Sequence, residues 1–211
     1  MKLSLRLRQA SHDLHAVAEK SGLMPLLLRS QLSGAHYAVF VRHLQAIYAA
    51  LEQGLSAAVC PPGFDFSPLL RSRALARDLA FLAPPTDTPL CPAACDYVQR
   101  LQQLAAARSP LLMAHAYVRY LGDLHGGQAL RRCVARLLPG DGIEGLHFYD
   151  FGPPERVAGL IVALRHALDS LALDAQQLAA MEQEVRLGFG LHIELFQQLP
   201  HAPAGAPAPH A

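Results

Sequence analysis

The chain contains 211 residues, of which 52% are hydrophobic and 17% are charged. That length and apolar content are typical of one domain, or at most two small ones, and exclude a chain that is disordered as a whole. The 18 lysines and arginines nearly balance the 17 aspartates and glutamates, so no broad basic surface for nucleic acid is indicated. The 11 histidines are the unusual count, and they suggest a metal or cofactor site without identifying the ligand.

The N-terminal residues and the cysteines bear on the compartment. Residues 1–9 alternate basic and apolar side chains without the continuous apolar core of a signal peptide. No stretch approaches the roughly 20 consecutive apolar residues that a membrane-spanning helix needs. The 4 cysteines are too few and too irregularly spaced for a disulfide framework. We therefore expect a soluble, cytoplasmic protein with no membrane partner.

Apolar residues recur at three- and four-residue steps through nearly all of the chain, which predicts helices. No segment shows a sustained alternation of apolar and polar residues, so no sheet is predicted. One helix begins at Ser33, an N-cap candidate, and another at Ser109, where Pro110 occupies the first helical position. The predicted helices cover residues 33–55, 72–82, 109–138, 153–170 and 174–199.

The loops between these helices are rich in proline or glycine, and none is long enough to separate two domains. Residues 201–211 contain only proline, alanine, glycine and histidine, which cannot build a packed core. The sequence therefore predicts a single all-α domain over residues 1–200 and a disordered tail over residues 201–211.

The first segment with candidate chemistry is the run over residues 7–19. His15 and Glu19 are four residues apart, so they share one face of a helix. An imidazole held by a carboxylate is a good neutral iron ligand, although a lone helical histidine is more often a solvated or core residue. A carboxylate-bridged di-iron bundle needs two Glu-x-x-His elements on helices. Only Glu144 to His147 fits that pattern, in a glycine-rich loop, so we reject this kind of site.

The second such segment, residues 115–128, contains three glycines within a helical pattern. Each glycine costs about 1 kcal/mol of helix stability relative to alanine. Gly122 and Gly126 share one face, which lets the backbone approach a broad flat ligand or another helix, and which also permits a kink. Asp123 lies between them and can hold water against a ligand on that face. Plain helix packing, with an ordinary Arg119–Asp123 helix pair, is the alternative.

Taken together, these stretches resemble the heme oxygenase family. Residues 117–128 resemble the distal helix of that family almost residue for residue, and residues 7–19 resemble its proximal helix. Weaker agreement lies at residues 47–52, 145–149 and 189–196, and the whole resemblance extends over residues 5–199. It implies an all-α fold in which heme is sandwiched between a proximal helix and a kinked distal helix.

The resemblance also implies roles for individual residues. His15 would be the axial ligand of the heme iron, and Gly122 and Gly126 would let the distal helix lie close over the porphyrin. Asp123 would anchor the water that delivers a proton to iron-bound dioxygen. Three further residues fall where the family holds the heme propionates: Arg8, Tyr117 and Arg165.

The function implied is oxygen-dependent cleavage of heme b to biliverdin, carbon monoxide and ferrous iron, with the α-meso position as the family default. The sequence contains no flavin, iron–sulfur or nicotinamide motif, so electrons would come from an external donor such as ferredoxin or a flavoprotein reductase. We expect a monomer. The alternatives are a heme carrier or sensor, in which Asp123 would have no use, and an unrelated helical bundle whose glycines only pack helices.

Two positions depart from the family pattern. His125 stands where a small serine is common, and we expect its ring to point away from the heme. His192 replaces a polar amide of the last helix and is expected to alter contacts below the heme.

Overall fold

The computed structural model describes the chain except for residues 58–60, 62, 85–87, 141 and 200–211. The described residues form helices and no strand, so the all-α prediction is confirmed. The predicted tail over residues 201–211 lies outside the described part of the chain. The α-helices are α1 (Leu3–Glu19), α2 (Met24–Leu28), α3 (Gly34–Ala57), α4 (Ser72–Leu82), α5 (Pro92–Ala106), α6 (Leu112–Ala116), α7 (Gly122–Ala135), α8 (Pro154–Asp169) and α9 (Ala175–Gln198). Shorter helical segments are η1 (Ser67–Leu69), η2 (Tyr117–Leu121) and η3 (His147–Tyr149).

Local signals place several helices where the sequence predicted them. α4 has the predicted bounds, and α8 begins at Pro154, whose fixed φ suits the first helical turn. α9 begins with a capping box: Gln177 donates its backbone N–H to the Asp174 carboxylate at 2.7 Å, and the Gln177 side chain accepts from the Asp174 N–H at 3.0 Å.

The helix predicted from Ser109 to Leu138 is divided into three parts. Its first regular turn begins at Leu112, because the preceding residues form tighter turns with the Pro110 carbonyl accepting from Met113 at 3.0 Å. The segment η2 then widens into a π-helical turn before α7 begins at Gly122. π-turns inside helices are rare and commonly mark functional sites. The predicted local weakness around the glycines therefore coincides with a change of helical type.

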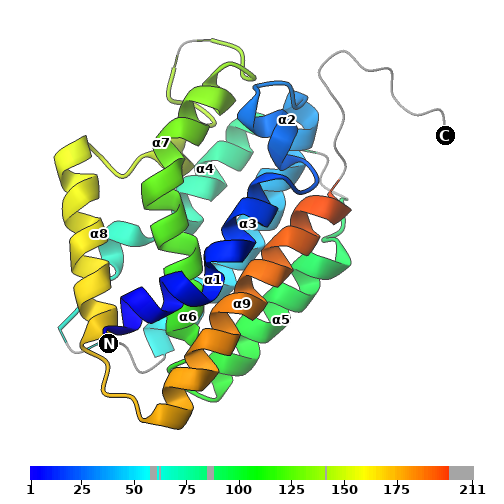
Figure 1. Cartoon of the computed structure of the whole chain (residues 1–211). Coiled ribbons are helices and arrows are strands. Elements are labelled where there is room, and N and C mark those ends of the chain that lie inside the picture. The colour runs from blue at the N-terminus through cyan, green and yellow to red at the C-terminus, as the bar shows by residue number, and fades with distance from the viewer. Residues whose placement is uncertain (58–60, 62, 85–87, 141, 200–211) are drawn as a thin grey trace.

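α1 and α7 do not pack closely on each other, and each is held mainly by other helices of the bundle (Figure 1). α1 packs mainly on α9 and α8, whereas α7 packs on α2, α8 and η3. Behind them, α3 packs on α4 and α5. The core includes a set of fully buried tyrosines: Tyr37, Tyr48, Tyr97, Tyr120 and Tyr149. Among the helices that the structure describes, none combines the length and apolarity required to cross a bilayer.

Candidate functional site

Two adjoining cavities occupy the space between α1 and α7. The inner cavity, of about 230 Å³, extends beneath α7 toward α2 and α9. The outer cavity, of about 370 Å³, opens between the start of α1, η2 and α8. Four residues line both of them: His15, Val118, Gly122 and Phe189. The two cavities are therefore parts of one cleft.

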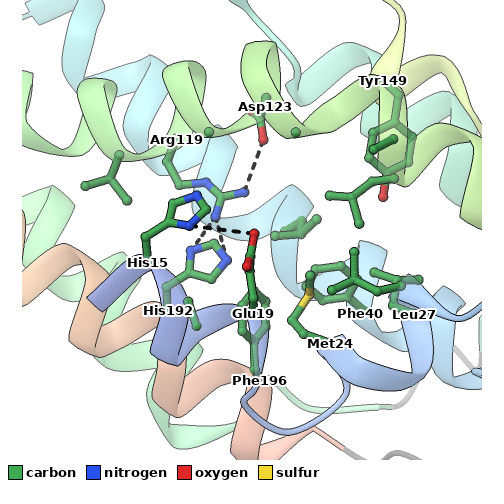
Figure 2. Close-up of a pocket in the computed structure, with 18 of the residues that line it drawn as sticks. His15, Glu19, Met24, Leu27, Phe40, Arg119, Asp123, Tyr149, His192 and Phe196 are labelled. Atoms are coloured by element: carbon green, nitrogen blue, oxygen red, sulfur yellow. Dashed lines mark hydrogen bonds and ion pairs between the residues drawn. The ribbon is translucent and has the colours of Figure 1, made fainter. Parts of the chain in front are cut away.

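His15 lies on the α1 side of this cleft with Glu19 one turn later (Figure 2). The His15 side chain is 63% exposed, and its Nδ1 lies 3.6 Å from Glu19 Oε1. The shared face predicted from the sequence is thus observed. The carboxylate lies on the Nδ1 side, which leaves the other ring nitrogen as the natural ligand atom.

Gly122 and Gly126 form the opposing wall. A Cβ atom added at either residue would meet no other atom within 4 Å, and both residues line the inner cavity. Their bare face is therefore directed at open space and not at another helix. Gly127 differs, because a Cβ there would contact the Tyr149 ring at 3.8 Å. The helix-packing alternative accounts for Gly127 but not for the pair that faces the cleft.

Asp123 belongs to a buried polar network above the inner cavity. Its carboxylate accepts a short hydrogen bond from the Tyr48 hydroxyl, and its Oδ1 lies 3.8 Å from Arg119 Nη2. Arg119 Nε also donates to the Tyr48 hydroxyl at 3.0 Å. Burial raises the pKa of Asp123, and the nearby Arg119 charge and the Tyr48 hydrogen bond oppose that rise. Arg119 and Asp123 do form the predicted helix pair, but a tyrosine from α3 joins it.

His192 extends this network to α9. Arg119 Nη1 lies 2.8 Å from His192 Nε2 and also against Nδ1, as the dashed lines in Figure 2 show. Burial lowers the pKa of His192 well below its usual value, and the Arg119 charge acts in the same direction. The imidazole is therefore neutral at physiological pH. That this residue alters contacts below the heme stays a prediction. In the structure its ring contacts Arg119 and the Phe196 ring, with 4.3 Å between the two ring centroids.

The outer cavity brings together Arg8, Tyr117 and Arg165, which come from α1, η2 and α8. Burial raises the pKa of the Tyr117 phenol, whereas a hydrogen bond with Ser11 and the charges of the two arginines lower it. The arginines supply forked donors of positive charge, and the phenol supplies one more donor. Tyr117 and Arg165 follow Arg8 in the sequence by 109 and 157 positions. The fold brings the three side chains into one region that is suited to binding carboxylates.

His125 lines the outer cavity but not the inner one. That its ring points away from the heme stays a prediction, and the structure places the ring at the outer end of the cleft. Its Nδ1 lies 2.6 Å from the Leu121 carbonyl oxygen, and its Nε2 lies 3.1 Å from Arg165 Nη2.

Sequence reasoning did not identify Tyr48 as a site residue, nor the group formed by the buried Glu184 and His115 and the half-buried Arg100. Arg100 donates to both Glu184 oxygens, at 2.9 Å and 2.5 Å, and His115 Nε2 lies 2.8 Å from Glu184 Oε1. These contacts join α5 and α9 to α6, the helix that leads into η2. They hold the N-terminal side of the glycine helix in place.

Comparisons with known proteins agree with this geometry. The sequence model of the family described as "Heme oxygenase" matches residues 1–198. The chain is 30% identical to heme oxygenase 1 of Nostoc sp. over 203 residues, covering 93% of this chain and 85% of that protein. It is 34% identical to heme oxygenase 1 of Rattus norvegicus over 206 residues, covering 93% of this chain and 71% of that protein.

Solved structures give the same result. The heme oxygenase of Leptospira interrogans is similar with a TM-score of 0.87 and 32% identity, covering 94% of this chain and all (100%) of that one. Heme oxygenase-2 of Synechocystis sp., solved in complex with heme and NO, has a TM-score of 0.85 and 30% identity, covering 94% of this chain and 85% of that one. The chain is therefore an enzyme of the heme oxygenase family.

Proposed function

We propose that this enzyme binds heme b between α1 and α7 and, with dioxygen and electrons from an external donor, cleaves it to biliverdin, carbon monoxide and ferrous iron. The observation that carries the proposal is the pair of bare glycines, Gly122 and Gly126, facing a cleft with His15 on its other side. A backbone face without side chains admits a flat macrocycle, and an imidazole is a common ligand of heme iron.

The residues around the cleft fit heme in each of its chemical parts. His15 offers a ring nitrogen for the iron, with Glu19 beside the other nitrogen. Phe40 and Phe196 supply apolar wall for the macrocycle. Arg8 and Arg165 lie at the outer end, where two propionates would reach solvent. Bound heme supplies the redox-active iron and the carbon framework that is oxidised.

The protein's own contribution at the distal side is to hold a proton donor at a fixed place. An ionised carboxylate only accepts hydrogen bonds, so a water molecule held by Asp123 directs its other proton into the cavity. Tyr48 occupies one carboxylate oxygen, and Arg119 favours the charged form. The network therefore fixes the orientation of Asp123 beside the glycine face, and it partly offsets the burial that raises the pKa of this carboxyl.

A carrier or sensor that binds heme without cleaving it would share His15 and the glycines. Such a protein gains nothing from a buried carboxylate beside the glycine face, and burial of that carboxylate opposes its charged form. The Asp123 network therefore favours the enzyme.

The test is to add heme to the protein, then oxygen with ascorbate or a ferredoxin system, and to record the absorption spectrum. We expect the Soret band to decay, biliverdin absorption to appear, and one carbon monoxide to be released for each heme. A Soret band that persists without biliverdin would favour the carrier, and failure to bind heme would refute both the enzyme and the carrier. We also propose that the enzyme is a monomer, which size-exclusion chromatography of the heme complex tests. We further propose that the enzyme works in the cytoplasm.

A further inference from the structure

The contact between His125 and Arg165 links the glycine helix to α8 at the outer cavity. His125 Nε2 and Arg165 Nη2 are 3.1 Å apart, although the residues are 40 positions apart in the chain. His125 follows Leu121 by one helical turn, and its Nδ1 lies 2.6 Å from the Leu121 carbonyl oxygen.

These two contacts determine which nitrogen of His125 carries the proton. A carbonyl oxygen only accepts, so Nδ1 must be the N–H donor toward Leu121. A guanidinium only donates, so Nε2 must be the unprotonated acceptor toward Arg165. Both ring nitrogens are thus used in complementary roles, and the ring ties the Arg165 head group to α7.

The position of this pair connects two functions of the cleft. Arg165 would otherwise be an exposed arginine on α8, with a long side chain that adopts many rotamers. His125 restricts it to a location that is fixed relative to α7. Gly122, three residues earlier on that helix, forms part of the bare face of the cleft. The helix α7 therefore both carries the glycine face of the cleft and holds the Arg165 guanidinium, which is the group suited to binding a carboxylate.

We propose that His125 is a positioning residue that fixes Arg165 to the glycine helix, and that it thereby sets the in-plane rotation of the porphyrin about the iron–His15 axis. The inference rests on the proposed function, because it concerns how the same cleft seats heme. The propionates at the edge of the porphyrin would bind Arg165, so the position of its guanidinium would set the rotation of the ring. Because His125 holds that guanidinium against α7, the same meso carbon would lie beside Gly122 and Asp123.

The first experiment measures seating without turnover. The ferric cyanide complexes of the parent protein and of His125→Ser are compared by proton NMR of the heme methyl groups. Serine is too short to reach Arg165. We therefore expect the seating ratio, which is the population of the minor rotational orientation of the heme relative to the major one, to rise about three- to tenfold, the effect of losing roughly one hydrogen bond. The matched control is His166→Ser on α8, whose histidine lines a separate surface groove, and it should leave the ratio unchanged.

The second experiment tests whether His125 acts through Arg165. Arg165→Gln should change the seating ratio in the same direction, and the double variant should change it no further than Arg165→Gln alone. Heme dimethyl ester, which lacks propionate charge, should bind the parent and His125→Ser with equal affinity. The distribution of biliverdin isomers should follow the seating ratio.

Unchanged seating in His125→Ser, or additive effects in the double variant, would overturn the inference while leaving the enzyme assignment intact. Failure of the parent protein to bind heme or to form biliverdin would instead overturn the proposed function. Circular dichroism melting of each variant identifies any effect that comes from a loss of folding.

Discussion

Replacing the cavity-facing glycines by alanine should stabilise the protein and impair heme binding at the same time. Gly122 has ordinary helical dihedrals, φ −59° and ψ −49°, and an added Cβ at Gly122 or Gly126 would meet no atom within 4 Å. Alanine removes the helix cost of glycine, so each substitution should raise the free energy of unfolding by about 1 kcal/mol. For a domain of this size that corresponds to a rise in Tm of roughly 2–4 °C.

The same substitutions should weaken heme binding. Each added methyl group projects into the space where the macrocycle would lie against the backbone. Overpacking of this kind costs about 1–3 kcal/mol, so the Kd for heme should rise by roughly fivefold to 150-fold. Differential scanning calorimetry without heme and Soret titration with heme measure the two effects separately.

Gly159→Ala on α8 is the matched control, because a Cβ there also meets nothing within 4 Å but lies on a groove away from the cleft. It should raise Tm by a similar amount and leave heme affinity unchanged. Heme affinity and spectrum that stay normal in a stabilised Gly122→Ala or Gly126→Ala protein would refute contact between this face and the porphyrin. A fall in Tm would refute the conclusion that the face is open.

Three further outcomes follow from the site and its supports. His15→Ala should abolish normal iron ligation, and a Soret and ferrous–CO spectrum identical to the parent's would mean that another histidine binds the iron. Asp123→Ala should retain heme but lower the biliverdin yield about tenfold or more in favour of peroxidase-like oxidation, and an unchanged yield would contradict its role in holding water. Burial raises the pKa of Glu184, but the hydrogen bonds from Arg100 and His115 together outweigh it and lower that pKa to about 2. The unfolded chain therefore binds more protons in acid, so about 3 kcal/mol of stability, present above pH 4.5, should be lost as the pH falls toward 2. Urea unfolding measured across that pH range should show this loss in the parent and not in Glu184→Gln.

Local patterns in the sequence were sufficient for most of the helices, because helix formation depends on apolar periodicity and on caps a few residues away. Residues 72–82 and the start of α9 at Asp174 are examples. The π-helical segment η2 was not predicted, and it lies against α9, a helix distant in the sequence. A Cβ added at Gly188 of α9 would lie 3.2 Å from His115 Nδ1 and 3.4 Å from Val118 Cγ2, so α9 presses closely on this segment.

The sequence by itself determined the all-α class and singled out His15, Gly122, Gly126 and Asp123, because their spacing places them on helix faces whatever lies opposite. Only the tertiary structure decided what those faces meet. It directs the glycines into a cleft and not onto a helix, and it adds Tyr48, 75 residues away, to the Asp123 carboxylate. Contacts between residues so far apart depend on how whole helices pack, which helical periodicity does not encode.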